Sequence, residues 1–230
     1  MRERGWRVAV LDSGISPLPP AGARRVRRFI DAGERVLECE PVEDPIGHGT
    51  VVAQIIAGAM CRMRLLVGQV LNERGRSTAA ALAAAIDWAL RQRAQLLHFS
   101  LGLPADRAVL RAAIGEAVAA GVLVIAAAPA RGRITYPASY SGVIRATGDA
   151  RCDDGQISYL GTATADFGAC PLYRSRCGTE TRGASVGAAY LSRHIVTHLT
   201  PGVALPEAHA VLVRRATFHG PERHRLAAGA

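Results

Sequence analysis

Three residues with the side chains of a nucleophilic catalytic set occur along this sequence in the order Asp12, His48 and Ser185. A serine hydroxyl becomes an effective nucleophile when a neighbouring base takes its proton and a carboxylate holds that base in the correct tautomer. Serine, histidine and aspartate supply the hydroxyl, the base and the carboxylate. If the fold brings the three together, they support attack on a carbonyl carbon.

Each of the three also has an ordinary structural explanation, as a turn residue for Asp12 and as a position at a helix start for His48 and Ser185. Their surroundings favour the catalytic interpretation. Small residues flank His48 in Gly47-His48-Gly49-Thr50 and Ser185 in Gly183-Ala184-Ser185-Val186-Gly187, so a substrate backbone can approach closely. Helix starts also carry unpaired amides that favour developing negative charge.

The elements that must position these residues alternate along the chain. Apolar runs typical of strands buried on both faces occur at 7–11, 64–71, 95–101, 122–128 and 143–146, with a shorter strand expected near 156–160. Helical spacing predicts helices over 51–60, 77–93, 104–120, 183–198 and 206–216. The pattern predicts an α/β fold with a parallel sheet. Asp12 then ends the first strand, at the edge where such sheets place their ligand crevice.

Length and composition fit one globular domain spanning residues 1–230. Apolar residues make up 49% and charged residues 20%, outside the disordered range, and no apolar run reaches the roughly 18 residues of a membrane helix. All 28 basic residues are arginine and the net charge is +9. The arginines are scattered and aromatic residues are few, so neither nucleic acid nor a membrane is expected as a partner.

The cysteines and the other histidines indicate no disulfide framework and no metal site. Five cysteines without a C-x-x-C pair favour free thiols, although a bridge between Cys170 and Cys177 stays open. His98 lies inside an apolar strand and is expected to be a hydrogen-bonded core residue. His194 and His198 are spaced for one helix face but lack the carboxylate of a zinc-protease motif.

The N-terminus predicts where the protein resides. Met1-Arg2-Glu3-Arg4-Gly5-Trp6 leads directly into the first strand, with no secretory hydrophobic segment. We therefore expect a cytoplasmic protein with neither a signal peptide nor a propeptide.

Five segments, in order, resemble the subtilisin-like serine proteases, which share the order Asp, His, Ser. Residues 8–15 (VAVLDSGI) look like the family's aspartate motif, 47–53 (GHGTVVA) like its histidine motif and 183–188 (GASVGA) like its serine motif; 100–102 (SLG) and 136–144 match further family segments. The resemblance implies a three-layer fold, a mostly parallel central sheet with helices on both faces. It also implies a serine endopeptidase in which Ser185 attacks, His48 transfers the proton and Asp12 orients His48.

The resemblance also places the substrate and implies no cofactor. A peptide is expected to lie extended as an added strand between two segments, Arg74-Gly75-Arg76 and Ser100-Leu101-Gly102. The wall of the pocket for the residue before the cut is assigned to Ala126, Ala127 and Ala128. Arginines around this groove predict acidic residues within about four positions before the cut, with no single arginine dominating: Arg74, Arg76, Arg131 and Arg133.

Two side-chain donors of the family's oxyanion hole are missing. Ala130 stands where the family has an asparagine, and Ala184 where it usually has a threonine. Loss of that asparagine costs about 100- to 1,000-fold in turnover in the subtilisin that serves as the standard example. The amide of Ser185 remains, and Arg131 and Arg133 are candidate replacements. The helix after His48 also leaves no room for the calcium loop of some relatives, so no metal is expected.

Size and the short N-terminus predict a dedicated maturation protease. Within the family, the chain is similar to the small proteases that remove the leader peptide from the cross-linked small subunit of quinohaemoprotein amine dehydrogenase. The implied partners are a leader-bearing precursor and the radical enzyme that modifies it.

Two other functions are compatible with parts of the sequence. The first is a catalytically impaired pseudoprotease that binds peptides as an assembly or chaperone module. The missing oxyanion donors favour it, and the complete set of three catalytic residues opposes it. The second is an aspartic protease, which lacks support because Asp12-Ser13-Gly14 has no second copy.

Overall fold

The structure is a computed structural model that describes residues 5–18, 25–59, 62–130, 132, 134–175 and 178–222. Arg131, Arg133 and Cys177, which the sequence singled out, lie outside the described residues. Cys170 is a free thiol, as are Cys39 and Cys152.

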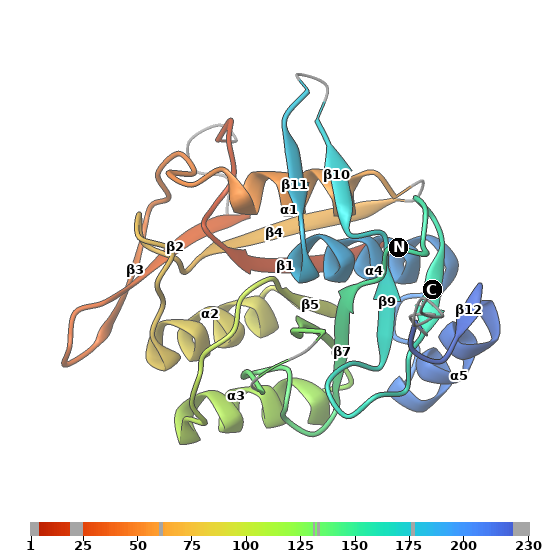
Figure 1. The fold of residues 1–230 in the computed structure, drawn as a ribbon. Helices are drawn as coiled ribbons and strands as arrows, with labels where there is room; N and C mark the ends of the chain where they lie inside the picture. The colour runs from red at the N-terminus through yellow and green to blue at the C-terminus, as the bar shows by residue number, and fades with distance from the viewer. Residues whose placement is uncertain are drawn as a thin grey trace.

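A ten-stranded, mostly parallel sheet runs through the molecule (Figure 1). Its order is β12-β8-β9-β7-β6-β5-β1-β4-β2-β3, and the antiparallel pairs among these strands are β2–β3 and β8–β9. The strands are β1 (Trp6–Asp12), β2 (Val26–Asp31), β3 (Val36–Cys39), β4 (Met63–Gln69), β5 (Leu96–Phe99), β6 (Leu123–Ala127), β7 (Val143–Gly148), β8 (Ile157–Tyr159), β9 (Phe167–Ala169) and β12 (Phe218–His219).

Helices cover both faces of this sheet. They are α1 (His48–Ala57), α2 (Ala79–Arg91), α3 (Ala108–Ala119), α4 (Ala184–His198) and α5 (Leu205–Arg215). Alternate residues of β1 point to opposite faces: Ala9 and Leu11 pack in one core with α2 and α3, whereas Val8 and Val10 pack in another with α1, α4 and α5. The three-layer α/β fold predicted from the sequence is confirmed.

The predicted elements are present, with differences at their ends and edges. Helix α3 begins at Ala108 and not at Pro104, because the amide of Arg107 donates to the hydroxyl of Tyr140 at 3.1 Å, which in turn donates to Asp106 at 2.9 Å. These contacts hold the preceding residues outside the helix. The strands that the sequence did not predict are short or lie toward the sheet edges. Such strands bury few side chains, so their apolar pattern is too weak to predict them.

A two-stranded hairpin was also not predicted. It is formed by β10 (Leu172–Arg174) and β11 (Glu180–Arg182), which pair antiparallel, and it projects from the molecule immediately before α4 (Figure 1). Within the described ranges, no helix is both long and apolar enough to cross a membrane.

Candidate active site

The three residues of the predicted catalytic set lie at the ends of neighbouring elements. Asp12 is the last residue of β1, His48 the first of α1, and Ser185 the second of α4. The Nδ1 atom of His48 is 2.8 Å from Oδ1 of Asp12. The hydroxyl of Ser185 donates to the carbonyl of Ser100, just beyond β5, at 2.9 Å. The structure therefore joins Asp12 to His48 directly and holds Ser185 against the end of β5, the strand that pairs with β1.

Close packing between α1 and the turn after β1 sets the position of His48. The amide of Gly49 donates to Oγ of Ser13 at 2.8 Å. A Cβ at position 49 would lie 2.4 Å from the carbonyl oxygen of Gly14, closer than any side chain allows. Glycine after His48 is thus required for the helix to bring the imidazole onto Asp12.

Asp44 is a residue of this site that sequence reasoning missed. Its carboxylate accepts from the amide of Gly47 at 2.9 Å and from both the amide and the hydroxyl of Thr50, at 2.9 and 2.7 Å. Burial alone would raise its pKa, but these hydrogen bonds hold the pKa below its ordinary value. An acidic residue just before a predicted helix start is the signal that could have identified it as a capping residue.

The surroundings of His48 make it a stronger base than a free histidine. The hydrogen bond to Asp12, whose side chain is fully buried, raises the pKa of His48. Burial of the imidazole lowers that pKa, and the negative charges of Asp12 and Asp44 raise it, so the net shift is upward. Since a general base works best when its pKa lies near the working pH, this arrangement suits proton transfer.

A buried histidine, His98, helps to hold Ser185 in position. His98 is fully buried in β5, with Nδ1 2.8 Å from Oγ of Ser192 and Nε2 2.6 Å from Oγ of Ser100. The Ser100 hydroxyl donates to the carbonyl of Ser185 at 3.3 Å, so it must accept from Nε2–H, leaving Nδ1 to accept from Ser192. The prediction of a hydrogen-bonded core histidine is confirmed.

This directional chain of hydrogen bonds ties two turns of α4 to β5. Burial, with a smaller contribution from the charge of His48, lowers the pKa of His98 to about 3. His98 is therefore neutral at any pH at which His48 acts as a base. These hydrogen bonds hold the backbone of Ser185 in place, and the neutral His98 adds no positive charge to the site.

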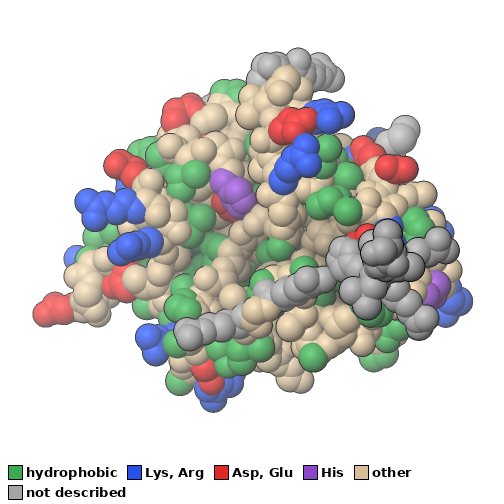
Figure 2. All heavy atoms as spheres, in the orientation of Figure 1, with side chains coloured by type: hydrophobic (Ala, Val, Ile, Leu, Met, Phe, Trp, Pro, Cys, Tyr) green, Lys and Arg blue, Asp and Glu red, His purple; other side chains and the backbone are tan. Residues whose placement is uncertain are grey.

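A groove of about 600 Å³ runs from the candidate catalytic residues between two walls. The predicted substrate segments form these walls: Gly75 and Arg76 on one side, and Ser100, Leu101 and Gly102 on the other, with His48 between them. Arg74 lies on the same loop but is not among the lining residues. Figure 2 shows the corresponding face, with a histidine beside an acidic side chain near the centre and arginine side chains on both flanks.

The candidate oxyanion region offers few donors. Ala130 is exposed and lines a separate cavity of about 300 Å³ with Thr147 and Gly148, and its methyl group cannot donate a hydrogen bond. Ala184 is likewise apolar. The amide of Ser185 lies in the first turn of α4, where backbone N–H groups lack helical partners. Among the described residues, this amide is a donor that an oxyanion at Ser185 could use.

The predicted pocket wall differs from the expectation in detail. The side chains of Ala126 and Ala128 are buried in the core on the α2–α3 face of the sheet, so these side chains pack inward and not toward the surface. Ala127, between them, points the other way and is half-buried. The alternation of a strand explains the difference.

The remaining histidine pair is held by an arginine. The Arg215 guanidinium donates to Nε2 of His194 at 3.3 Å and lies 2.9 Å from Nδ1 of His198. Burial, together with the positive charges of His198 and Arg215, lowers the pKa of His194 to about 4. Among the described residues, no group of three or more metal-ligating side chains is found.

Comparisons with known proteins agree with this geometry. Residues 3–170 match the subtilase family. Subtilisin BL of Lederbergia lenta is 31% identical over 212 residues, covering 87% of this chain and 74% of that protein. The thermostable alkaline protease of Halalkalibacterium halodurans is also 31% identical, but the match covers 55% of its length. The chain spans about half the length of the first curated relatives it matches.

Solved structures show the same fold. Sphericase superposes with a TM-score of 0.64 and 19% sequence identity, covering 92% of this chain and 83% of its own. The family match includes Asp12 and His48 and ends before Ser185, so the case for Ser185 as the nucleophile depends on its motif and on its contacts in this structure.

Proposed function

Because this chain belongs to the subtilase family, we propose that it is a serine endopeptidase with Ser185 as nucleophile, His48 as general base and Asp12 as the group that orients His48. The observation that carries the proposal is the 2.8 Å contact between His48 Nδ1 and a fully buried carboxylate. That contact fixes the tautomer in which Nε2 is free to accept a proton.

The reaction proceeds by acyl transfer. Ser185 Oγ leaves its hydrogen bond to Ser100 by rotation of one side-chain bond and attacks the scissile carbonyl carbon, while Nε2 of His48 takes the hydroxyl proton. The oxyanion accepts a hydrogen bond from the Ser185 amide. The C–N bond then breaks, His48 gives the proton to the leaving amine, and water hydrolyses the acyl-enzyme with His48 again as base.

Peptide hydrolysis tests this function. The purified chain, incubated with an unfolded protein, is expected to yield new amino and carboxyl termini that mass spectrometry can assign. Ser185→Ala, purified identically, serves as the control for a contaminating protease. Cleavage that survives Ser185→Ala, or no cleavage by the natural chain, would contradict the proposal.

We further propose that the natural substrate is one specific protein and not bulk polypeptide. The finer proposal is a cytoplasmic maturation protease that removes the leader from the small subunit of quinohaemoprotein amine dehydrogenase, with that precursor and its cross-linking radical enzyme as partners. The sequence resemblance supports it, and the free thiols of Cys39, Cys152 and Cys170 suit a reducing compartment.

This finer proposal needs its own test. Purified leader-bearing precursor, before and after cross-linking, is incubated with the enzyme, and the products are mapped. A single cut that releases the leader is expected. Cleavage of unfolded proteins together with an uncut precursor, or recovery of the protein outside the cytoplasm on cell fractionation, would overturn the maturation role and leave the protease activity standing.

A peptide-binding pseudoprotease is the second candidate, and two observations favour it. Ala130 and Ala184 supply no side-chain donor to the oxyanion, and the Ser185 hydroxyl donates to Ser100 and not to His48 in this structure. Under this alternative the chain binds extended peptides in the groove with the same affinity as Ser185→Ala, and no peptide bond is broken.

A further inference from the structure

Among the described residues, the groove beside Ser185 is lined by one permanently charged side chain. Of the described residues that line it, His48 and Arg76 are the two with titratable side chains, and the others are apolar or uncharged. His48 must be neutral to act as a base, so Arg76 is the described lining residue that carries a charge in the working state. A peptide bound there meets the Arg76 guanidinium.

The charge of Arg76 is not satisfied by the protein. Several arginines elsewhere in the described residues pair with carboxylates, for example Arg145 with Asp166 and Arg151 with Asp149. No acidic group among the described residues lies within ion-pair distance of Arg76. Its guanidinium is therefore available to a ligand without first breaking a salt bridge.

The loop around Arg76 is built to hold its backbone in place. Oδ1 of Asn72 accepts from the amides of Arg74 and Arg76, both at 3.0 Å, and the amide of Asn72 donates to the carbonyl of Arg76 at 3.0 Å. Gly75, with φ of +67°, makes the tight turn between the two arginines. These hydrogen bonds with Asn72 thus hold the backbone of Arg76 in place.

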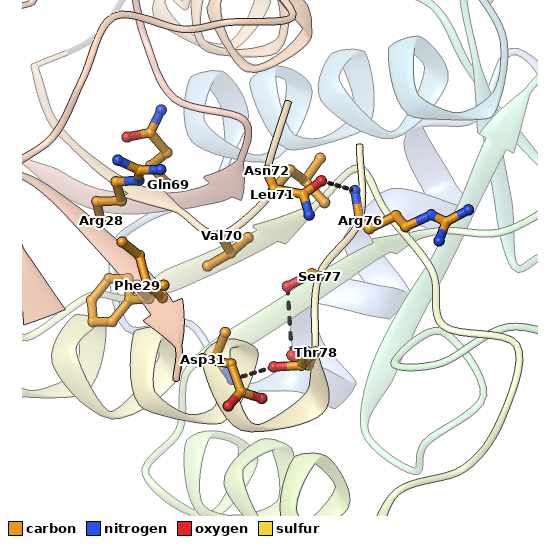
Figure 3. Close-up of a pocket in the computed structure, with 12 residues that line it drawn as sticks. Arg28, Phe29, Asp31, Gln69, Val70, Leu71, Asn72, Arg76, Ser77 and Thr78 are labelled. Carbon is orange, nitrogen blue, oxygen red and sulfur yellow. Dashed lines mark hydrogen bonds between the residues drawn. The ribbon is translucent and has the colours of Figure 1, made fainter. Parts of the chain in front are cut away.

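Figure 3 shows the other side of this loop, a cavity of about 390 Å³ that Arg76 also borders. The Arg76 amide points to Asn72, and the Arg76 side chain extends away from Asp31 and Thr78. The Asp31 carboxylate, which also lines this cavity, is hence not directed at the Arg76 guanidinium. The Arg76 side chain is thus left free to contact a peptide in the groove that it lines.

We propose that Arg76 makes this groove selective for peptides with Asp or Glu on the amino side of the cut, an inference that rests on the proposed protease function. The groove extends from Ser100, which contacts Ser185, to Pro104. A peptide added as a strand runs residue for residue along that wall. The acidic residue therefore lies within about four positions of the scissile bond.

The effect of Arg76 on peptide selectivity can be distinguished from the effect of the protein's net charge. The net charge of +9 attracts any acidic peptide and speeds encounter at low salt, whatever the register. A local pair with Arg76 instead favours one position of the peptide. An exposed pair of this kind changes kcat/KM by about two- to fivefold.

The test uses matched fluorogenic peptides that carry Glu, Gln or Lys at each of the four positions before the cut. At one of these positions, the natural chain is expected to cleave Glu over Gln, and Gln over Lys, by about two- to fivefold in kcat/KM each. Arg76→Gln removes this ranking at that position, and Arg76→Glu reverses it. Arg74→Gln is the control: the residue is on the same loop, outside the groove, and its loss leaves the ranking intact.

The outcomes distinguish this inference from the proposed function. Three outcomes overturn the role of Arg76 and leave the protease activity standing: cleavage of all peptides at equal rates, a ranking that persists in Arg76→Gln, or a ranking that Arg74→Gln weakens as much as Arg76→Gln does. No cleavage of any peptide by the natural chain overturns the proposed function, and the inference with it. Both arginines are exposed, so equal melting temperatures are expected for the variants.

Discussion

The candidate site has a proton-transfer side and an oxyanion side, and the two differ in the polar groups that they contain. On the proton-transfer side, Asp12 is fully buried, His48 is held against it at 2.8 Å, and Asp44 fixes the start of α1 through three hydrogen bonds. On the oxyanion side, Ala130 and Ala184 offer no side-chain donor. The described residues thus hold the proton-transfer groups firmly, whereas neither Ala130 nor Ala184 can stabilise developing charge through its side chain. This difference suits slow, selective cleavage better than rapid digestion.

The largest expected effect is on the proton-transfer side. Asp12→Asn keeps the shape of the side chain but stabilises the wrong tautomer of His48, and in the standard serine-protease example this substitution costs about 10,000-fold in kcat. We expect a loss of the same order, measured as kcat on a fluorogenic peptide. Asp87→Asn, on the exposed face of α2, is the control and should have full activity. A loss below about tenfold would show that Asp12 does not orient the base.

Restoring a donor is the next largest change. Ala130→Asn is expected to raise kcat by about tenfold or more, up to the roughly 100- to 1,000-fold that such a donor contributes in the standard subtilisin example. Ala130→Leu is of similar size without an amide, so it should bring no gain. If the asparagine variant is no faster than the leucine variant, another group already fills the role and the oxyanion side is not as reduced as it looks.

Packing on the proton-transfer side gives a third prediction. Gly49→Ala puts a Cβ 2.4 Å from the carbonyl of Gly14, and such overpacking costs about 1–3 kcal/mol. For a chain of this size we expect the melting temperature to fall by about 2–10 °C. Gly115→Ala, in α3, meets no heavy atom within 4 Å and should leave the melting temperature equal or higher. Equal values for both variants would contradict the tight contact between α1 and the β1 turn.

The smallest effect concerns pH. The charge of Asp44 raises the pKa of His48, and the enzyme loses activity as pH falls through that pKa because His48 becomes protonated. Asp44→Asn keeps a hydrogen-bond acceptor but removes the charge. The acidic limb of the kcat/KM profile should therefore move to lower pH, by about a few tenths of a unit. A limb that stays in place or moves to higher pH would show that Asp44 acts on the helix start alone.

Local chemistry in the sequence was enough to predict the parts of the site that one short segment defines. Asp12 ends a buried strand, and His48 and Ser185 lie among small residues at helix starts, so the neighbourhood of each could be predicted from the sequence. The core strands were equally clear, because most residues of β1, β5 and β6 are apolar and both faces of these strands are buried.

Contacts between distant segments could not be predicted in the same way. The link from Ser192 through His98 to Ser100 joins residues 94 positions apart, and nothing in the local pattern marks it. The orientation of Ala126, Ala127 and Ala128 depends on the register of β6 between β5 and β7. The β10–β11 hairpin has too few apolar residues to be recognised as strands, since its pairing is local and exposed.

The central claim is that the reduced oxyanion side still leaves Ser185 a working nucleophile, and labelling with a fluorophosphonate tests it most directly. The reagent forms a covalent bond to an activated serine, and mass spectrometry then maps the adduct. The structure predicts one adduct, on the peptide that contains Ser185, which is lost in His48→Ala and formed at least about 100-fold more slowly in Asp12→Asn. An unlabelled Ser185 in the folded natural chain, or labelling that is equally fast without His48, would contradict it.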